Sequence, residues 1–274
     1  MREAVERHGG VFQTGSQQRS QYGGKFRFAC EMVRSGRIGE LQRIRVHVGG
    51  PSEPFALPAE KPMDTLDWDF WVGPAYWTPY NSELCPDHTR GFPAWRYYLP
   101  YGGGGMCGWG AHHFDIAQWG VGMSRSGPVE VIPPEGHDVD MLTYRYENGV
   151  IMTRGGGKYD GGVEFVGTDG RIQVSRSTLR TNPAELMKTP IGRDEVHLYD
   201  ASSQHGNWLK CVRARKEPIC PVEIGHRSAT VCHLGNIAYW TGNRIEWDPD
   251  RERMVDSPEA ERWVSRPYRE PWRL

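Results

Sequence analysis

The sequence predicts an α+β fold, in which helices pack on one face of an open, mainly antiparallel β-sheet. Two observations carry this prediction. Five short runs between residues 129 and 174 alternate apolar and polar side chains at period two, and helical runs stand before and after them. A third observation argues against a nucleotide-binding fold: no G-x-G-x-x-G motif opens a helix after a strand anywhere in the 274 residues.

The first part of the chain holds few regular elements. We expect a helix over residues 1–8 closed by Gly9 and Gly10, a short buried strand over 11–14, a helix from about 21 to 34 and a strand over 38–48. The stretch from Gly49 to Gly105 is rich in proline, glycine and aromatic residues and has a short helical run at 67–72. A long irregular stretch of this kind is typical of binding loops.

The glycine run 102–105 interrupts the chain before a helix expected at about 109–119. The strands that follow are expected at 129–132, 141–146, 150–154, 163–166 and 171–174, and their spacing indicates an antiparallel meander. Helices are then expected at about 204–215 and 223–241, before a polar tail that contains Trp247 and Asp248.

Charge and composition exclude several partner classes. A net charge of -1 and a pI near 6.8 provide no field that would attract nucleic acid or an anionic membrane. No run of 18 apolar residues is present, so we expect a chain without membrane contact, located in the cytoplasm. The six cysteines form no C-x-x-C pair and are expected to be free thiols.

Five segments, taken in order, resemble the Gfo/Idh/MocA oxidoreductase family. They are VFQTGSQQRS at 11–20, VRSGRIG at 33–39, DWDFWVGP at 67–74, WGAHHFDIAQW at 109–119 and EIGHRS at 223–228. The resemblance implies an open antiparallel sheet that binds a sugar or sugar derivative and often mediates oligomers. It therefore predicts a small-molecule carbohydrate as ligand and a homo-oligomer as assembly.

By this resemblance, residues 1–14 are the remnant of the last helix and strand of a dinucleotide-binding domain, and residues 15–274 are the substrate-binding domain with an extended polar tail. Full-length relatives use NAD(P), whereas we expect no dinucleotide to be bound by this chain alone. An export signal could have been lost with the missing amino-terminal part. The tripeptide Glu60-Lys61-Pro62 matches the family's catalytic lysine turn, but it lies in the wrong part of the chain and is interpreted as a coincidence.

The resemblance assigns proton transfer to His112. The family's Asp-x-x-x-His pattern falls on Gly108 and His112, so the histidine is present and the aspartate is not. Asp115, one turn later, is expected to hold the His112 tautomer. His113 projects ~100° away around the helix and is expected to contact the substrate instead. The alternative is that His112 is an ordinary helix histidine with a backbone or carboxylate partner.

Further residues are predicted to bind the substrate or the cofactor. Trp95 and Tyr101 would stack on a sugar ring and Arg96 would bond its hydroxyls, unless these aromatic residues simply fill a core. Gln17 and Arg19 are expected at the mouth of the site, where Gln17 would contact the cofactor and Arg19 the substrate. The alternative is that both belong to a polar hinge between domains. His205 and His226 are expected near the pocket, or are helix-end residues.

A metal ion is a less favoured cofactor. Its candidate ligands are His88, His112, His113 and Asp115, but adjacent histidines on one helix chelate poorly. Three functions remain open: a carbohydrate oxidoreductase, a cofactor-independent or metal-assisted sugar lyase, hydratase or glycosidase that uses His112, and a non-catalytic sugar-binding or oligomerisation module.

Overall fold

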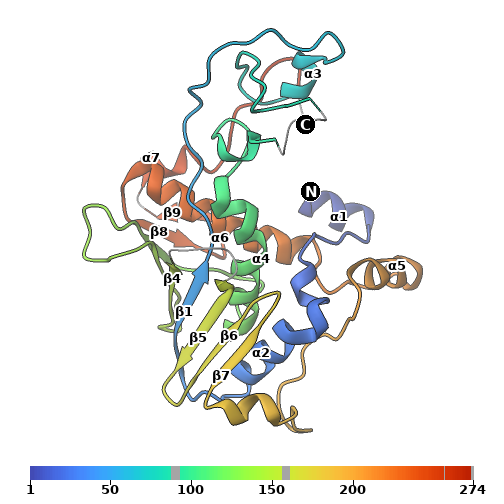
Figure 1. Ribbon diagram of the computed structural model, residues 1–274, viewed down its shortest axis with the longest axis vertical. Helices are drawn as coiled ribbons and strands as arrows, with labels where there is room; N and C mark the ends of the chain where they lie inside the picture. The colour runs from blue at the N-terminus through green and yellow to red at the C-terminus, as the bar shows by residue number, and fades with distance from the viewer. Residues whose placement is uncertain (88–92, 156–160, 256, 273–274) are drawn as a thin grey trace.

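The computed structural model describes residues 1–87, 93–155, 161–255 and 257–272. Nine strands form one sheet (Figure 1). Their bounds are β1 Leu41–His47, β2 Glu130–Ile132, β3 Thr143–Arg145, β4 Ile151–Gly155, β5 Val163–Gly167, β6 Arg171–Val174, β7 Leu179–Asn182, β8 Ile245–Asp248 and β9 Arg253–Val255.

Helices of very different length accompany the sheet. The α-helices are α1 Arg2–His8, α2 Lys25–Arg34, α3 Trp68–Val72, α4 Gly104–Val121, α5 Gln204–Ala214, α6 Val222–Thr241 and α7 Pro258–Glu261. Short 3-10 turns are η1 Gln17–Arg19, η2 Tyr22–Gly24, η3 Trp95–Tyr97 and η5 Ala184–Lys188.

The strand order is β7-β6-β5-β1-β4-β3-β2-β8-β9, and every neighbouring pair is antiparallel except β1 with β4. The predicted α+β class with a mainly antiparallel sheet is therefore confirmed. The predicted simple meander is wrong, because β1 inserts between β4 and β5. Ile44 of β1 lies between Met152 and Phe165 on the buried face, so insertion completes the apolar layer.

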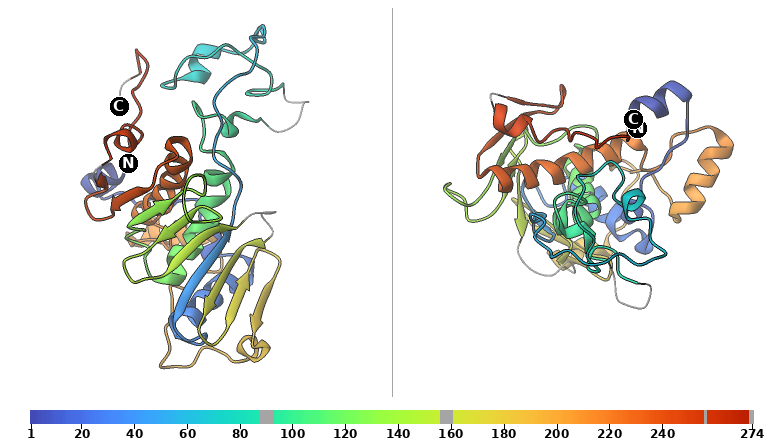
Figure 2. Two further views of the ribbon diagram at one scale, coloured as in Figure 1. Left: turned by 90° about the vertical axis from the view of Figure 1, so that its left-hand side faces the viewer. Right: turned by 90° about the horizontal axis from the view of Figure 1, so that it is seen from above.

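Helices α2, α4 and α6 cover one face of this sheet (Figure 2). Phe165 packs so closely beneath α4 that a side chain at Gly120 would lie 2.3 Å from its ring. The opposite face is polar along the row formed by Thr153, Arg45, Glu164, Gln173 and Arg180. The alternation at period two thus separates an apolar layer under the helices from a polar outer layer.

The irregular segment after β1 has a small core of its own. Trp68, Val72, Tyr80 and Leu84 are buried there, and Trp68 stacks on Trp71 at 4.6 Å between ring centroids. This segment and the carboxy-terminal tail extend beyond one end of the sheet (Figure 1). The Arg269 side chain joins them through its bonds to Asp69 and to the Gly73 carbonyl.

Three boundary predictions are wrong. Residues 11–14 form no strand; they are half-buried and extended, and the Thr14 amide donates to the Cys220 carbonyl instead of to a sheet. Strand β7 was not predicted, and β8 lies where a polar tail was expected, because their short alternation is weak in sequence.

Helix α4 begins at Gly104, inside the glycine run that was expected to precede it. Close packing of backbone explains this start. A side chain at Gly104 would lie 2.5 Å from the Pro51 carbonyl carbon, and one at Gly105 would lie 2.7 Å from the Gly49 Cα. The Met106 amide also donates to the Gly50 carbonyl at 2.8 Å. Tertiary packing here overrides the low helix propensity of glycine.

Candidate functional site

A buried ion pair links η1 to α4, three residues after His112 on the helix. Arg19 donates through Nε and Nη2 to the two carboxylate oxygens of Asp115, each at 2.8 Å, and the Ser228 hydroxyl of α6 donates to the same carboxylate at 2.8 Å. The Arg19 and Asp115 side chains are 2% and 0% exposed. The arginine also lies over the Trp119 ring, at 4.7 Å from the centroid.

This pair corrects two predictions. Arg19 was expected at the mouth of the site, but its enclosed guanidinium already has a bidentate carboxylate partner. Asp115 was expected to orient His112, yet its oxygens bind Arg19 and Ser228. Both residues therefore hold η1, α4 and α6 together.

His113 is also enclosed, which corrects its predicted role as a substrate ligand. The side chain is 1% exposed, and Nδ1 lies 2.7 Å from the carbonyl oxygen of His47, to which it donates. Burial lowers the pKa of His113 to about 4, and the nearby His112 and Arg176 act in the same direction. His113 is accordingly neutral at pH 7 and serves as a core histidine that links α4 to the end of β1.

Gln18 connects His112 to Arg176. In the amide orientation that its neighbours require, Nε2 donates to the His112 carbonyl at 2.9 Å. The amide oxygen then accepts from Arg176 Nε at 3.3 Å. Gln18 is almost fully buried, so this network is fixed in position.

His112 lies at the surface of this network. Its ring is half-buried, and Nδ1 has no hydrogen-bond partner within the described residues. Burial lowers the pKa of His112, and the positive charge of Arg176 lowers it further, against a weaker opposite effect of Asp115. His112 is therefore a neutral imidazole at pH 7 with an unused nitrogen, which is what a general base needs.

Arg176 is the functional candidate that the sequence did not reveal. It follows β6, and its guanidinium lies 4.6 Å from the Trp109 ring centroid and 5.1 Å from that of Tyr22. The Trp109 ring in turn lies 6.1 Å from that of His112. No local pattern marks Arg176, since its partners come from η2 and α4. Together, His112, Trp109 and Arg176 present a base, an aromatic surface and a fixed cation.

The remaining predicted residues divide between two other regions. Trp95 and Arg96 lie on η3, which contacts α4, and the Arg96 guanidinium lies 6.0 Å from the Trp95 ring centroid. Tyr101 bonds to the Thr78 hydroxyl and packs against Trp71, so it belongs to the small loop core. Gln17 is half-buried, and its Oε1 has no partner among the described residues.

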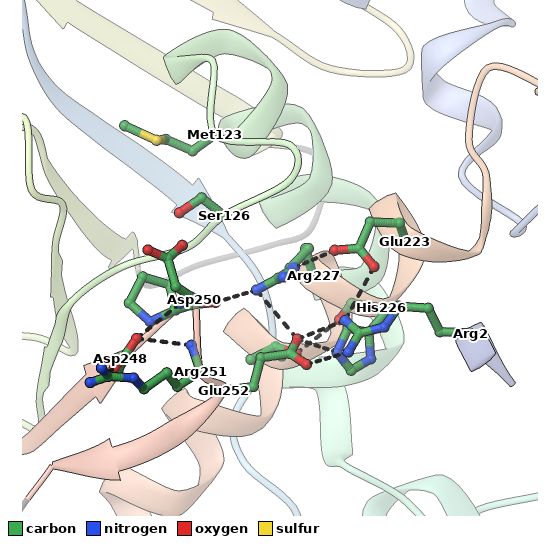
Figure 3. Close-up of polar contacts among 12 residues, drawn as sticks. Arg2, Met123, Ser126, Glu223, His226, Arg227, Asp248, Asp250, Arg251 and Glu252 are labelled. Atoms are coloured by element: carbon green, nitrogen blue, oxygen red, sulfur yellow. Dashed lines mark hydrogen bonds and ion pairs between the residues drawn. The ribbon is translucent and has the colours of Figure 1, made fainter. Parts of the chain in front are cut away.

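His205 and His226 lie on other helices. His205 is exposed on α5. His226, on α6, pairs with Glu252 at 2.5 Å, in a network with Arg2, Arg227 and Glu223 (Figure 3). These contacts tie α1 and the β8–β9 turn to the start of α6. His226 has an ordinary carboxylate partner near a helix end and also lines a cavity of about 610 Å³, so both interpretations made from the sequence stay open.

The metal hypothesis has no structural support in the part of the chain that is described. Within the described ranges, no three His, Cys, Asp or Glu side chains are grouped as metal ligands. His113 and Asp115 are occupied by His47 and Arg19, and His88 lies outside the described residues. Lys61, of the Glu-Lys-Pro tripeptide, is 85% exposed and pairs with Asp64.

The described residues do not fit a dinucleotide pyrophosphate. Such a group binds backbone amides where a strand turns through glycines into a helix. Gly23 and Gly24 lead into α2, but they follow a 3-10 turn and not a strand. The glycine run 102–105 opens α4, and the chain's own backbone fills the space beside it: a side chain at Gly102 would lie 2.4 Å from the Arg96 carbonyl oxygen. No described helix is long and apolar enough to cross a membrane.

The sheet with helices on one face is the architecture of an α/β domain, and the family match assigns this domain to an oxidoreductase family. The chain belongs to the Gfo/Idh/MocA family: residues 53–274 match the family model described as "Oxidoreductase family, C-terminal alpha/beta domain". This match confirms the family resemblance found in the sequence. A search of the curated proteins found no match.

Solved structures support the fold. Levoglucosan dehydrogenase in complex with NADH and L-sorbose is similar, with a TM-score of 0.54 and 14% identity over 91% of this chain and 69% of that one. The aldose-aldose oxidoreductase from Caulobacter crescentus in complex with glycerol has a TM-score of 0.52 and 17% identity over 89% of this chain. The match covers 66% of that oxidoreductase, so this chain spans just under two thirds of its length.

Proposed function

We propose that this chain is the sugar-binding part of a Gfo/Idh/MocA oxidoreductase, and that His112 accepts the proton of a sugar hydroxyl. The family match supports the class of enzyme. The similar structures contain NADH with L-sorbose in one case and glycerol in the other, which supports a polyhydroxylated ligand. Their identity to this chain is low, so the choice of sugar rests on the site itself.

One observation carries the proposal: the half-buried His112 imidazole is kept neutral, and its Nδ1 has no hydrogen-bond partner among the described residues. A buried nitrogen without a partner is costly to keep in a purely structural residue. A hydroxyl of a bound sugar would form a hydrogen bond with the His112 imidazole. The neighbouring Trp109 ring can pack against the apolar face of the same sugar.

The chemistry of these residues is a proton transfer. The neutral imidazole of His112 takes the hydroxyl proton, and the positive charge of Arg176 stabilises the alkoxide that forms. Arg176 is suited to this because stacking between Trp109 and Tyr22 fixes its position before the ligand binds. The Arg19–Asp115 pair keeps η1 and α4 in register beneath the base.

Calorimetric titration with L-sorbose and with D-glucose tests this site. We expect binding to the unmodified chain, a weaker affinity in Arg176→Gln, and an unchanged affinity in Arg180→Gln, which removes an exposed arginine from the next strand. Chemical shifts of the His112 ring should move on addition of the sugar. Equal affinities in all three proteins, with no shift at His112, would place the ligand elsewhere.

Product analysis separates the remaining alternatives. A sugar turned over without any added dinucleotide, and no longer turned over by His112→Ala, would favour the lyase, hydratase or glycosidase function. Binding that survives in His112→Ala without any turnover, with or without a dinucleotide, would favour a non-catalytic sugar-binding module.

A further inference from the structure

A second group of reactive side chains lies between α4 and α6, away from His112. Cys107 of α4 faces three residues of α6. Its Sγ lies 3.8 Å from His233 Nδ1 and accepts from Asn236 Nδ2 at 3.5 Å, and the Cys232 thiol is also within hydrogen-bonding reach. None of these residues takes part in the proposed sugar site.

Two glycines allow the helices to approach closely at this point. A side chain at Gly103 would lie 3.0 Å from Asn236 Nδ2 of α6, and one at Gly110 would lie 2.7 Å from Cys232 Sγ. Asn236 is fully buried and donates to the Gly103 carbonyl at 2.9 Å, which fixes its amide beside the sulfur. Its Oδ1 has no partner among the described residues.

The charges around the sulfur favour a thiolate. The hydrogen bond from Cys232 lowers the pKa of Cys107 most, burial opposes it, and His233 and the Arg266 cation lower it further. The Cys107 sulfur in turn raises the pKa of His233. Tyr144, which approaches from the sheet, is buried and stays neutral because burial raises its pKa. These effects favour a Cys107 thiolate beside a protonated His233.

The pair is open to solvent, and its His233 side chain lines a cavity. Cys107 is half-buried and His233 is exposed. His233 forms part of the wall of a cavity of about 610 Å³, together with Trp240, Trp263 and Arg266. The rings of Trp240 and Trp263 lie 5.0 Å apart. An anionic group would find Arg266 and the His233 imidazolium there, next to an apolar surface.

We propose that Cys107 is a nucleophile that forms a mixed disulfide with small anionic disulfides, which His233 and Arg266 hold at the edge of this cavity. The Cys107 sulfur attacks one sulfur of the disulfide, and a new S–S bond forms as the old one breaks. The electron pair of the broken bond leaves with the second sulfur, which takes a proton from the His233 imidazolium. The protein thiolate is oxidised and the departing thiol is reduced, so no other oxidant is needed.

Oxidised glutathione is the probe for this reaction, with intact-mass and peptide mass spectrometry as readout. At pH ~6 an ordinary thiol is less than about 1% ionised, so Cys107 should react at least about tenfold faster than Cys85. Cys85 is the matched control, because it is half-buried and burial raises its pKa. We expect Cys107→Ser to abolish the fast phase and Cys85→Ser to retain it.

Two further variants test the roles of the neighbours. His233→Gln should slow the reaction at pH ~6 by about tenfold and shift its pH dependence towards that of a free thiol. Arg266→Gln should slow iodoacetate, which is anionic, more than iodoacetamide, which is neutral. Equal rates at Cys107 and Cys85 would overturn the proposal. A Cys107–Cys232 disulfide in place of the glutathione adduct would also overturn it, because the product would then be intramolecular.

Discussion

Arg19 and Asp115 form a bidentate ion pair with two bonds of 2.8 Å, and both side chains are almost completely enclosed. Ninety-six positions separate them in the chain. Their contact joins the segment that precedes α2 to the centre of α4, directly below His112. The proposed base therefore depends on a structural ion pair that does not itself contact the ligand.

Breaking this pair should destabilise the fold strongly. Asp115→Asn or Arg19→Ala leaves an unpaired buried charge, and we expect a loss of about 3–5 kcal/mol in the free energy of unfolding, measured by urea denaturation. Arg45→Ala removes an ion pair of the outer sheet face and should cost no more than about 1 kcal/mol. Near-equal losses in these variants would show that the buried pair is solvated in solution.

Acid should destabilise the protein through His113. Burial lowers its pKa to about 4, while an unfolded histidine titrates near ~6.5. Between these values the unfolded chain binds a proton that the folded chain does not, so the free energy of unfolding falls as pH falls from ~6.5 to about 4. The shift corresponds to about 3 kcal/mol at the acid end.

Urea denaturation at several pH values measures this loss. His113→Gln should flatten the pH dependence in that window, whereas His205→Gln, at an exposed position of α5, should leave the slope unchanged. A slope that persists in full in His113→Gln would assign the acid sensitivity to other groups.

Removal of Arg176 should raise the pKa of His112. The arginine charge and burial both lower that pKa, so Arg176→Gln leaves only burial. A proton-detected titration of the His112 ring by NMR should show its midpoint at higher pH in Arg176→Gln than in the unmodified chain. Arg180→Gln is the control and should not move the midpoint. An unchanged midpoint in Arg176→Gln would remove Arg176 from the site.

The sequence predicted the strands and helices whose apolar side chains recur at a regular spacing along the chain. Alternation at period two located β5 and β6 to within a residue, and the apolar face of residues 26–33 located α2. The position of β1 between β4 and β5 was not predictable, because a single alternating strand is compatible with either neighbour. The start of α4 at Gly104 depends on backbone from residues 49–52, which no local propensity describes.

The site was predicted less well, for a related reason. His112 was found from its position in a family pattern, but its partner Arg176 lies 64 positions further along the chain and follows no motif. Asp115 was assigned to His112 because the two are one turn apart on the helix. The bidentate geometry of Arg19 makes it the stronger partner, and only the fold brings it to α4.

Self-association, expected from the family resemblance, is predicted to depend on salt. The outer face of the sheet is free of covering helices among the described residues (Figure 2), but it carries Arg45, Glu164 and Arg180 rather than an apolar surface. A dimer formed through this face would be held by ion pairs between copies. Its association should therefore weaken as added salt shortens the Debye length from about 10 Å at 0.1 M to about 3 Å at 1 M.

Light scattering over a range of protein and salt concentrations measures this dependence. Glu164→Lys removes the negative charge opposite Arg45 and should dissociate the assembly at low salt, whereas Glu3→Lys on α1, far from the sheet, should not. An oligomer that persists at high salt and in Glu164→Lys would require a different interface. Because the outer row alternates Arg45 with Glu164 across neighbouring strands, a two-fold copy can place each charge opposite its complement. This complementarity is the physical basis for expecting association through a polar face.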